Sequence, residues 1–247
     1  MRIILCGYDG HMGREVRTCA ERAKDCVILA GVDPMGGRED PLCAADFSEV
    51  TCEADVIIDF SHHSMTGALM DFAEARKLPV VLATTGQTEA EKARIEQAAR
   101  KIPVFLAANY SLGIAVMSDL VRRTAALYPD AEIEIVEQHH DRKLDAPSGT
   151  ALALFRAVQE VRPSAVARTG RSGQGKRTPE EVGIHAIRMG NIVGVHEVMI
   201  GTQNERITLK HEAFSRGVFA EGSLKAAAFL MGKQPGLYDM KDLLRGE

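Results

Sequence analysis

A glycine-rich turn directly after a short apolar run is the feature that most constrains how this chain can fold. The run covers residues 2–6 (Arg-Ile-Ile-Leu-Cys), and the glycines after it, from Gly7 to Gly13, are spaced G-x-x-G-x-x-G. A helical pattern then extends over residues 12–23. Glycine permits the backbone conformations of a tight turn from strand to helix, so this start is typical of a parallel α/β sheet.

Similar apolar runs and helical patterns alternate along the first part of the chain. The runs that predict further strands are residues 26–32, 54–60, 79–83 and 103–107, and the later helical patterns are residues 64–77 and 89–101. Strands that are apolar throughout are expected where both faces of a sheet are covered. The alternation therefore predicts an α/β fold with a doubly wound parallel (Rossmann) sheet.

The pattern changes after Asn109. Long helices are predicted at residues 112–127 and 148–161, and the strand-like segments are residues 132–137, 185–188, 195–200 and 206–211. These segments predict an α+β unit with a mixed or antiparallel sheet, and the helical stretch 220–231 is expected to pack back onto the first unit. We expect a dinucleotide-binding domain of residues 1–110 and 217–247. The inserted residues 111–216 would form a substrate-binding and oligomerisation domain, with a polar loop at 169–178.

The amino-acid composition excludes several classes of binding partner. The chain has 30 Lys+Arg against 34 Asp+Glu without basic blocks, which argues against nucleic acid and anionic membranes as partners and leaves small molecules. No apolar run approaches the roughly 20 residues of a membrane span. The five cysteines all lie in the first 52 residues, contain no C-x-x-C pair and predict free thiols. We therefore expect a cytoplasmic protein.

The glycine turn is a candidate for binding a dinucleotide. Its spacing departs from G-x-G-x-x-G because Asp9 occupies the second glycine position, and an ordinary strand-to-helix turn is the alternative. Asp33 lies 33 − 13 = 20 residues after Gly13, where an acidic residue usually binds the adenosine ribose; the alternative is a solvated turn residue before Pro34.

That carboxylate suits an unphosphorylated ribose, so NADH is expected to be preferred and NADPH tolerated, with His11 or Arg38 available to compensate a 2′-phosphate. The turns after the fourth and fifth strands should lie at the carboxyl edge of the sheet, where the nicotinamide binds, although either can be a simple connection. The predicted cofactor-binding residues are Gly7, Tyr8, Asp9, Gly10, His11, Met12, Asp33, Ala83, Thr84, Thr85, Ala107, Ala108, Asn109 and Tyr110.

The densest polar segment covers residues 137–150, between a predicted strand and a predicted helix. It places His139, His140 and Lys143 close together, and such a cluster of cations favours an anionic ligand. Gly149 and Thr150 stand where the N–H groups of the next helix can bind a carboxylate. A histidine titrates near neutral pH and suits general acid or base catalysis, and Lys143 can neutralise a carboxylate or assist protonation.

Two other interpretations of this segment remain. His139 and His140 could bind a metal, but adjacent residues of a strand point to opposite faces and no further ligand pair has helical spacing, so no metal site is expected. The segment could also be a solvated charged loop.

With these residues the chain resembles the dihydrodipicolinate (4-hydroxy-tetrahydrodipicolinate) reductases of the diaminopimelate route to lysine. The resemblance covers nearly the whole chain, and its most specific part is the segment from His139 to Ala151. It also includes the glycine turn with Met12-Gly13, residues 83–86, 107–113 and 188–196, and the closing 236–240.

The resemblance implies an enzyme that reduces 4-hydroxy-tetrahydrodipicolinate to tetrahydrodipicolinate with loss of water, by hydride transfer from NADH or NADPH. It implies that His139 is the general acid, that Lys143 is a second proton donor or carboxylate partner, and that His140, Gly149 and Thr150 bind the substrate. It further implies a homotetramer joined through the sheet of the inserted domain.

The chain departs from that family at three cofactor positions. Many members carry arginine at the position of His11, a small residue at that of Asp9 and phenylalanine at that of Tyr110. The first two differences put NADPH preference in doubt. The rival hypotheses are another dehydrogenase of the same layout, disfavoured because no cysteine follows residue 52, and a non-catalytic module that senses NADH.

Overall fold

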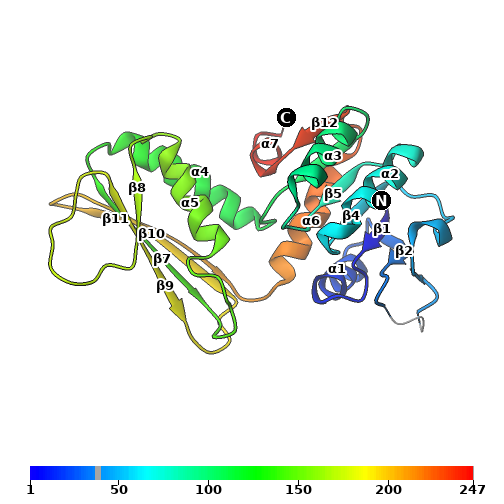
Figure 1. The fold of residues 1–247 in the computed structure, drawn as a ribbon, viewed down its shortest axis with the longest axis horizontal. Coiled ribbons are helices and arrows are strands. Elements are labelled where there is room, and N and C mark those ends of the chain that lie inside the picture. The colour runs from blue at the N-terminus through cyan, green and yellow to red at the C-terminus, as the bar shows by residue number, and fades with distance from the viewer. Residues whose placement is uncertain (37–39, 247) are drawn as a thin grey trace. The chain divides into compact units, whose positions relative to one another are not determined.

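The fold is described from a computed structural model, which describes residues 1–36 and 40–246. The chain divides into two compact units (Figure 1). The first contains residues 1–111 and 216–247, and the second contains residues 112–215.

The first unit is built on a wholly parallel seven-stranded sheet in the order β12-β6-β5-β4-β1-β2-β3. Its strands are β1 (Arg2–Cys6), β2 (Val27–Val32), β3 (Cys43–Ala44), β4 (Val56–Asp59), β5 (Val80–Leu82), β6 (Pro103–Leu106) and β12 (Gly236–Tyr238). Because the strands are parallel, all their carboxyl ends lie at one edge of the sheet.

Helices cover both faces of this sheet. Alternate side chains of β1 point to opposite faces: Ile4 packs in one core with α2 (Thr66–Arg76) and α3 (Glu89–Ala99), and Ile3 packs in another with α1 and α6. Helix α1 covers His11–Arg22, α6 covers Gly217–Leu230 and α7 covers Met240–Arg245; the short 3-10 helices are η1 (Phe47–Glu49) and η2 (His63–Met65). The doubly wound parallel fold predicted from the apolar runs is confirmed.

The second unit is a five-stranded sheet in the order β11-β10-β7-β9-β8. Its strands are β7 (Glu132–His139), β8 (Val166–Thr169), β9 (Glu181–Arg188), β10 (Gly194–Gly201) and β11 (Arg206–Ala213), and its helices are α4 (Leu112–Leu127) and α5 (Gly149–Gln159). Both helices pack against apolar side chains of the sheet such as Ile135, Ile184 and Val198 in one core (Figure 1).

The direction of one strand pair departs from a simple antiparallel sheet. Strand β10 is antiparallel to β7 and β11, but β7 and β9 are parallel. A parallel neighbour needs a crossover connection, and here the chain runs through α5 and β8 before it reaches β9. The short strands β3, β8 and β12 were not predicted, because two to four residues are too few to show a period.

The polar loop predicted at residues 169–178 connects β8 to β9, and its arginines bind the sheet. The Arg171 guanidinium lies 3.4 Å from the Glu181 carboxylate. Arg177 is mostly buried and donates to the Glu134 carboxylate and to the carbonyl oxygens of Ile133 and Glu181. The charge of Arg177 is therefore engaged within the unit.

All five cysteines are free thiols, as the odd number and spacing predicted. Among the described residues, no helix has the length and apolar character needed to cross a membrane.

Two helical glycines of the first unit give a test of this packing. A Cβ atom at Gly222 in α6 would overlap the Tyr110 carbonyl oxygen, whereas a Cβ at Gly67 in α2 would meet no atom within 4 Å. We expect Gly222→Ala to lower the free energy of unfolding by about 2 to 3 kcal/mol, because backbone must move. Gly67→Ala should be neutral or stabilising by up to about 1 kcal/mol. Urea unfolding measures both, and equal effects would contradict this account of α6.

Candidate functional site

The glycine turn brings backbone close to backbone at the end of β1. Gly7 has φ +74°, and its N–H donates to the Val32 carbonyl at 2.9 Å. A Cβ atom at Gly7 would overlap the Phe60 carbonyl oxygen, and one at Gly13 would overlap the Gly7 carbonyl oxygen. Helix α1 begins after Gly10, and in the described structure no side chain caps its first turn. The turn therefore leaves a helix N-terminus suited to an anion.

Asp33 lies beside this turn, as predicted. One carboxylate oxygen accepts the Asp9 N–H and the other accepts the Met35 N–H, each at 3.0 Å. The Asp9 side chain approaches the same region, where Arg17 lies 4.0 Å from its carboxylate. Two carboxylates thus stand close together at the end of β2.

The side chains of the two predicted tyrosines lie in the core, not at the surface of the site. Tyr8 is 2% exposed, its ring packs where a Cβ of Gly31 would be, and its hydroxyl donates to Asp40 at 2.7 Å. The Tyr110 hydroxyl bonds to the Leu82 and Phe105 carbonyl oxygens at 2.9 and 3.1 Å. Only the backbone of these two residues is therefore available to a ligand.

The remaining residues of the turn are placed differently. His11 is exposed as the first residue of α1, and Met12 is partly buried against the core. Arg38, the other cation considered for a 2′-phosphate, lies outside the described residues.

The turns after β4 and β5 are joined through a buried carboxylate. Asp59 is 1% exposed and accepts the Thr84 hydroxyl at 2.6 Å and the Ser61 hydroxyl at 2.5 Å. Burial raises the pKa of Asp59, and the hydrogen bonds from Ser61 and Thr84 oppose that effect. The Thr84 side chain is therefore turned inward, and Thr85 is the exposed threonine of this turn.

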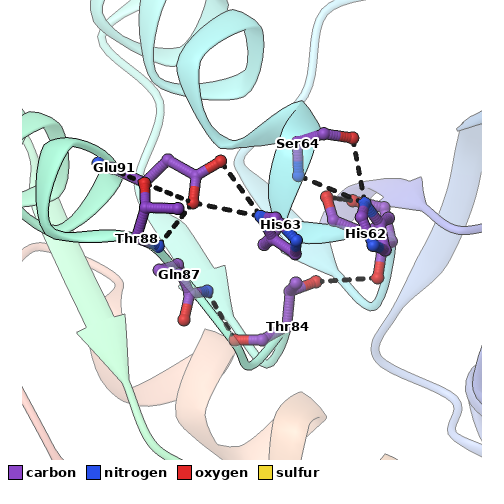
Figure 2. Close-up of polar contacts among 8 residues, drawn as sticks. His62, His63, Ser64, Thr84, Gln87, Thr88 and Glu91 are labelled. Atoms are coloured by element: carbon purple, nitrogen blue, oxygen red, sulfur yellow. Dashed lines mark hydrogen bonds and ion pairs between the residues drawn. The ribbon is translucent and has the colours of Figure 1, made fainter.

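A second connection lies nearer the surface (Figure 2). The imidazole of His63, the first residue of η2, lies beside the His62 ring and 3.1 Å from both oxygens of the Glu91 carboxylate. Glu91 also accepts the Thr88 N–H at 2.7 Å in the capping box of α3, and the Gln87 amide donates to the Thr84 carbonyl at 2.7 Å (Figure 2). Hydrogen bonds thus hold the turn at residues 83–88 at both ends, through Thr84 at its start and through Thr88 at its end.

The turn after β6 contains the other predicted cofactor residues. Ala107 is half-buried and Ala108 is exposed, so their small side chains leave room beside this turn. The Asn109 side chain accepts the Ser111 N–H at 2.8 Å, which shapes the backbone between them.

In the second unit, His139 ends β7 and lies almost entirely within the protein. Its Nδ1 donates to the Glu137 carboxylate at 2.6 Å. Burial lowers the pKa of His139, Glu137 opposes this effect, and the nearby cations Lys143 and Arg188 add to it. The backbone also holds the residue, since its carbonyl oxygen accepts the Met189 N–H at 2.9 Å. Nδ1 is committed, so Nε2 is the nitrogen that can serve a ligand.

Glu137 is fully buried and bonds to more than His139. The Arg188 guanidinium donates to both carboxylate oxygens at 2.8 and 2.7 Å, and the Ser148 N–H donates at 3.0 Å. These hydrogen bonds and that from His139 outweigh burial and lower the pKa of Glu137. The carboxylate therefore stays ionised inside the protein.

A second histidine, His196 on β10, lies edge-on to His139 at a ring distance of 5.1 Å. Its Nε2 is 3.1 Å from the Ser148 hydroxyl, which caps α5 by accepting the Ala151 N–H. Burial, followed by the charge of His139, lowers the pKa of His196 to about 4. His196 is therefore a neutral imidazole at pH 7, packed edge-on against the ring of the predicted proton donor.

The predicted substrate residues lie on the segment after β7 and in the first turn of α5. The Lys143 ammonium lies 2.8 Å from the Asp145 carboxylate, and the buried Nδ1 of His140 has no hydrogen-bond partner among the described residues. Gly149 begins α5 with open space at its Cβ position, and Thr150 follows in the same first turn. One unit thus brings together two histidines, a lysine and a helix N-terminus. The described residues contain no cluster of three metal-ligating side chains.

Several residues that organise the two sites were given no role from the sequence, although Glu137 and Ser148 lie in the predicted polar segment 137–150. Glu137 and Arg188 are 51 positions apart and Ser148 and His196 are 48 apart, so no local pattern connects them. Asp59 at the end of a predicted strand was the one detectable signal, because a charged residue closing an apolar run is unusual.

Comparisons with known proteins agree over the full chain. Residues 1–110 match the family model "Dihydrodipicolinate reductase, N-terminus" and residues 113–244 match "Dihydrodipicolinate reductase, C-terminus". Proteins named 4-hydroxy-tetrahydrodipicolinate reductase from Caldanaerobacter subterraneus subsp. tengcongensis and Clostridium tetani are 45% and 43% identical. Each alignment covers 99% of this chain, and 98% and 97% of those proteins.

Solved structures show the same fold. The dipicolinate-bound dihydrodipicolinate reductase from Paenisporosarcina sp. TG-14 superposes with a TM-score of 0.81 at 23% identity, with 97% of each chain covered. A myo-inositol dehydrogenase from Corynebacterium glutamicum gives 0.60 at 15% identity, covering 100% of this chain and 93% of its own.

The low pKa of His196 predicts an acid-sensitive fold. An unfolded histidine binds a proton near pH 6.5 and folded His196 only near pH 4, so its stabilising contribution is present above pH 6.5 and lost as pH falls. From pH 7 to pH 5 we expect this residue to account for about 2 kcal/mol of lost stability. Urea unfolding midpoints at both pH values measure it. His196→Gln should reduce the difference between the unfolding midpoints at pH 7 and pH 5. His62→Gln, which changes an exposed ring, should leave that difference unchanged.

Proposed function

The chain belongs to the dihydrodipicolinate reductase family and reduces 4-hydroxy-tetrahydrodipicolinate to tetrahydrodipicolinate with a pyridine nucleotide, in the diaminopimelate route to lysine; we propose here how its residues divide that work. The observation that carries the proposal is the position of His139. It is an oriented imidazole beside Lys143 and the N-terminus of α5.

His139 is the general acid of this proposal. Loss of water from C4 of the substrate leaves a conjugated imine, and a hydride added at C4 produces an enamine that must take up a proton. Because Nδ1 of His139 bonds to Glu137, Nε2 carries that proton to the enamine carbon. The substrate's two carboxylates favour the protonated imidazole, which offsets the low pKa of His139 in the free protein.

The substrate carboxylates are assigned to the surrounding cations and amides. Lys143 exchanges its partner Asp145 for a substrate carboxylate, or assists proton transfer. His140 and the first-turn N–H groups at Gly149 and Thr150 bind the other carboxylate, where the helix dipole favours negative charge.

The cofactor is assigned to the first unit. The close approach at Gly7 and Gly13 and the uncapped start of α1 fit a pyrophosphate, and a nicotinamide bound at the turns after β5 and β6 would supply the hydride. Within these turns the contacting groups are Thr85, the backbone of Thr84 and Tyr110, and the positions of Ala83, Ala107, Ala108 and Asn109.

NADH is proposed as the preferred cofactor, with NADPH accepted more weakly. Asp33 would accept hydrogen bonds from the ribose hydroxyls, and with Asp9 beside it a 2′-phosphate would meet two carboxylates. Of the described residues, His11 at the start of α1 and Arg17, whose guanidinium lies 4.0 Å from the Asp9 carboxylate, are basic side chains that could offset this repulsion.

A homotetramer in the cytoplasm is proposed as the working form. For the assembly, the sheet face away from α4 and α5 carries Ile187, which is 41% exposed and could pack against another subunit. For the location, the free thiols suit a reducing compartment such as the cytoplasm.

The reaction itself is tested by mixing the purified protein with the condensation product of aspartate semialdehyde and pyruvate, in parallel with NADH and NADPH. We expect loss of reduced-nicotinamide absorbance with both cofactors, faster with NADH. Binding of NADH without its consumption would contradict the proposal and favour a sensor.

His139→Gln tests the general acid. A positioned acid contributes about two to four orders of magnitude, so kcat should fall by that factor while the NADH dissociation constant stays unchanged. Turnover at the parent rate would remove His139 from the mechanism. His185→Gln, a histidine on β9 that bonds to Glu134, is the matched control.

Asp33→Ser tests cofactor choice by direct binding, measured from the fluorescence of the reduced nicotinamide. Loss of hydrogen bonds to a carboxylate should weaken NADH binding about tenfold or more, while NADPH binding stays the same or improves. Asp55→Asn, at an aspartate that bonds to Arg2 just before β4 begins, is the control. An unchanged ratio of the two dissociation constants would contradict the role of Asp33.

A further inference from the structure

The Glu137 carboxylate connects three separate segments of the second unit. It is fully buried, and its two oxygens accept from His139 on its own strand, from Arg188 on β9, and from the Ser148 N–H before α5. A single side chain therefore bonds both to the proposed proton donor and to the turn that leads into the proposed carboxylate-binding helix.

We propose that Glu137 is a positioning residue for the reaction, which orients His139 with Nε2 toward the substrate and holds a negative charge against the imidazole that carries the proton. The proposal rests on the general-acid role of His139. Glu137 itself, with no exposed surface, would not touch the substrate.

The geometry determines which nitrogen carries the mobile proton. A carboxylate only accepts hydrogen bonds, so the 2.6 Å contact requires a proton on Nδ1 of His139. Neutral His139 therefore has its lone pair on Nε2, and protonated His139 has its transferable proton there. The contact also fixes the rotation of the ring, which lies close enough to β10 that a Cβ at Gly194 would be 3.2 Å from Nε2.

The charge balance around His139 explains why a carboxylate is needed. The charged and titratable groups around the ring are Glu137 on β7, Arg188 on β9, His196 on β10, and Lys143 on the segment after β7. Burial and both cations disfavour a protonated imidazole, and Glu137 is the anion that opposes them. Arg188 in turn holds Glu137 in its ionised form through two hydrogen bonds.

The third contact links proton transfer to substrate binding. The Ser148 N–H donates to Glu137 at 3.0 Å, and the Ser148 hydroxyl caps α5 immediately before Gly149. A displaced carboxylate at position 137 would therefore disturb both functions at once. We expect changes in kcat and in the KM for the substrate, with the cofactor dissociation constant unchanged.

Glu137→Gln in the full-length protein is the test. The amide keeps the size of the side chain but loses the charge, so the pKa of His139 should fall by about one unit or more. The high-pH limb of the kcat profile should move to lower pH by the same amount. At pH values above this limb, kcat of the variant should be at least about tenfold lower than that of the parent protein. Lowering the pH should restore part of the rate.

A readout independent of turnover accompanies this profile. With ¹³C-labelled histidine, NMR titration of the His139 imidazole, assigned by its loss in His139→Gln, should show the lowered pKa directly. Glu137→Asp keeps the charge and should restore the limb toward its parent position. Glu134→Gln removes a carboxylate of the same strand that also bonds to a histidine and an arginine, and should leave the limb in place.

Arg188→Gln gives a test of opposite sign and serves if Glu137→Gln does not fold. Removal of this cation should raise the pKa of His139 and move the limb to higher pH, because His139 and the Ser148 N–H still donate to Glu137 and keep it ionised. A rate that falls equally at every pH, with the His139 titration unchanged in either variant, would overturn the proposal and leave Glu137 a purely structural residue. Parent turnover in His139→Gln would instead remove the general-acid assignment, whatever the NMR titration of Glu137→Gln showed.

Discussion

The second unit depends on the burial of one negative charge. An ionised carboxylate inside a protein costs several kcal/mol unless it is paired and hydrogen-bonded. Glu137 meets this condition only because Arg188 reaches it from β9, Ser148 donates from the turn before α5, and His139 donates from its own strand. The parallel pairing of β7 with β9, in register from Ile133 to His139, brings these donors to the same end of the sheet. The chemistry of the site follows from that arrangement.

The first unit also has a carboxylate buried at the end of a strand, but in a different electrostatic setting. Asp59 accepts hydrogen bonds from Ser61 and Thr84, which are neutral, and its pKa is raised. Glu137 has an arginine, and its pKa is lowered. Asp59 thus joins two turns through neutral hydrogen-bond donors, whereas Glu137 is paired with an arginine and a histidine. The same residue class performs two tasks because only one of them has a cation within reach.

The limits of prediction follow from the range of the interactions. The strands of the first sheet and the helices over them were predicted to within a few residues, since periodicity and glycine turns are local. The position of Asp33 beside the glycine turn was also predicted from spacing alone. Tyr8 and Tyr110 stay predicted cofactor residues through their backbone, since their rings belong to the core; sequence position did not tell which way the Tyr8 ring points. The parallel direction of β9 was likewise not predicted, because the crossover from β7 to β9 includes β8, which is too short to recognise in the sequence.

The sequence by itself determined the family, the reaction and the two segments that carry the proposed chemistry, because short-range patterns encode turns, strand ends and helix starts. Tertiary structure decided how these residues behave. The lowered pKa values of His139 and His196, the lowered pKa of Glu137 and the inward turn of Thr84 arise from burial and from neighbours that include groups far away in the chain, such as Arg188 for Glu137 and Asp59 for Thr84. Burial and charge act through space, so only the folded chain could show which neighbours each group would have.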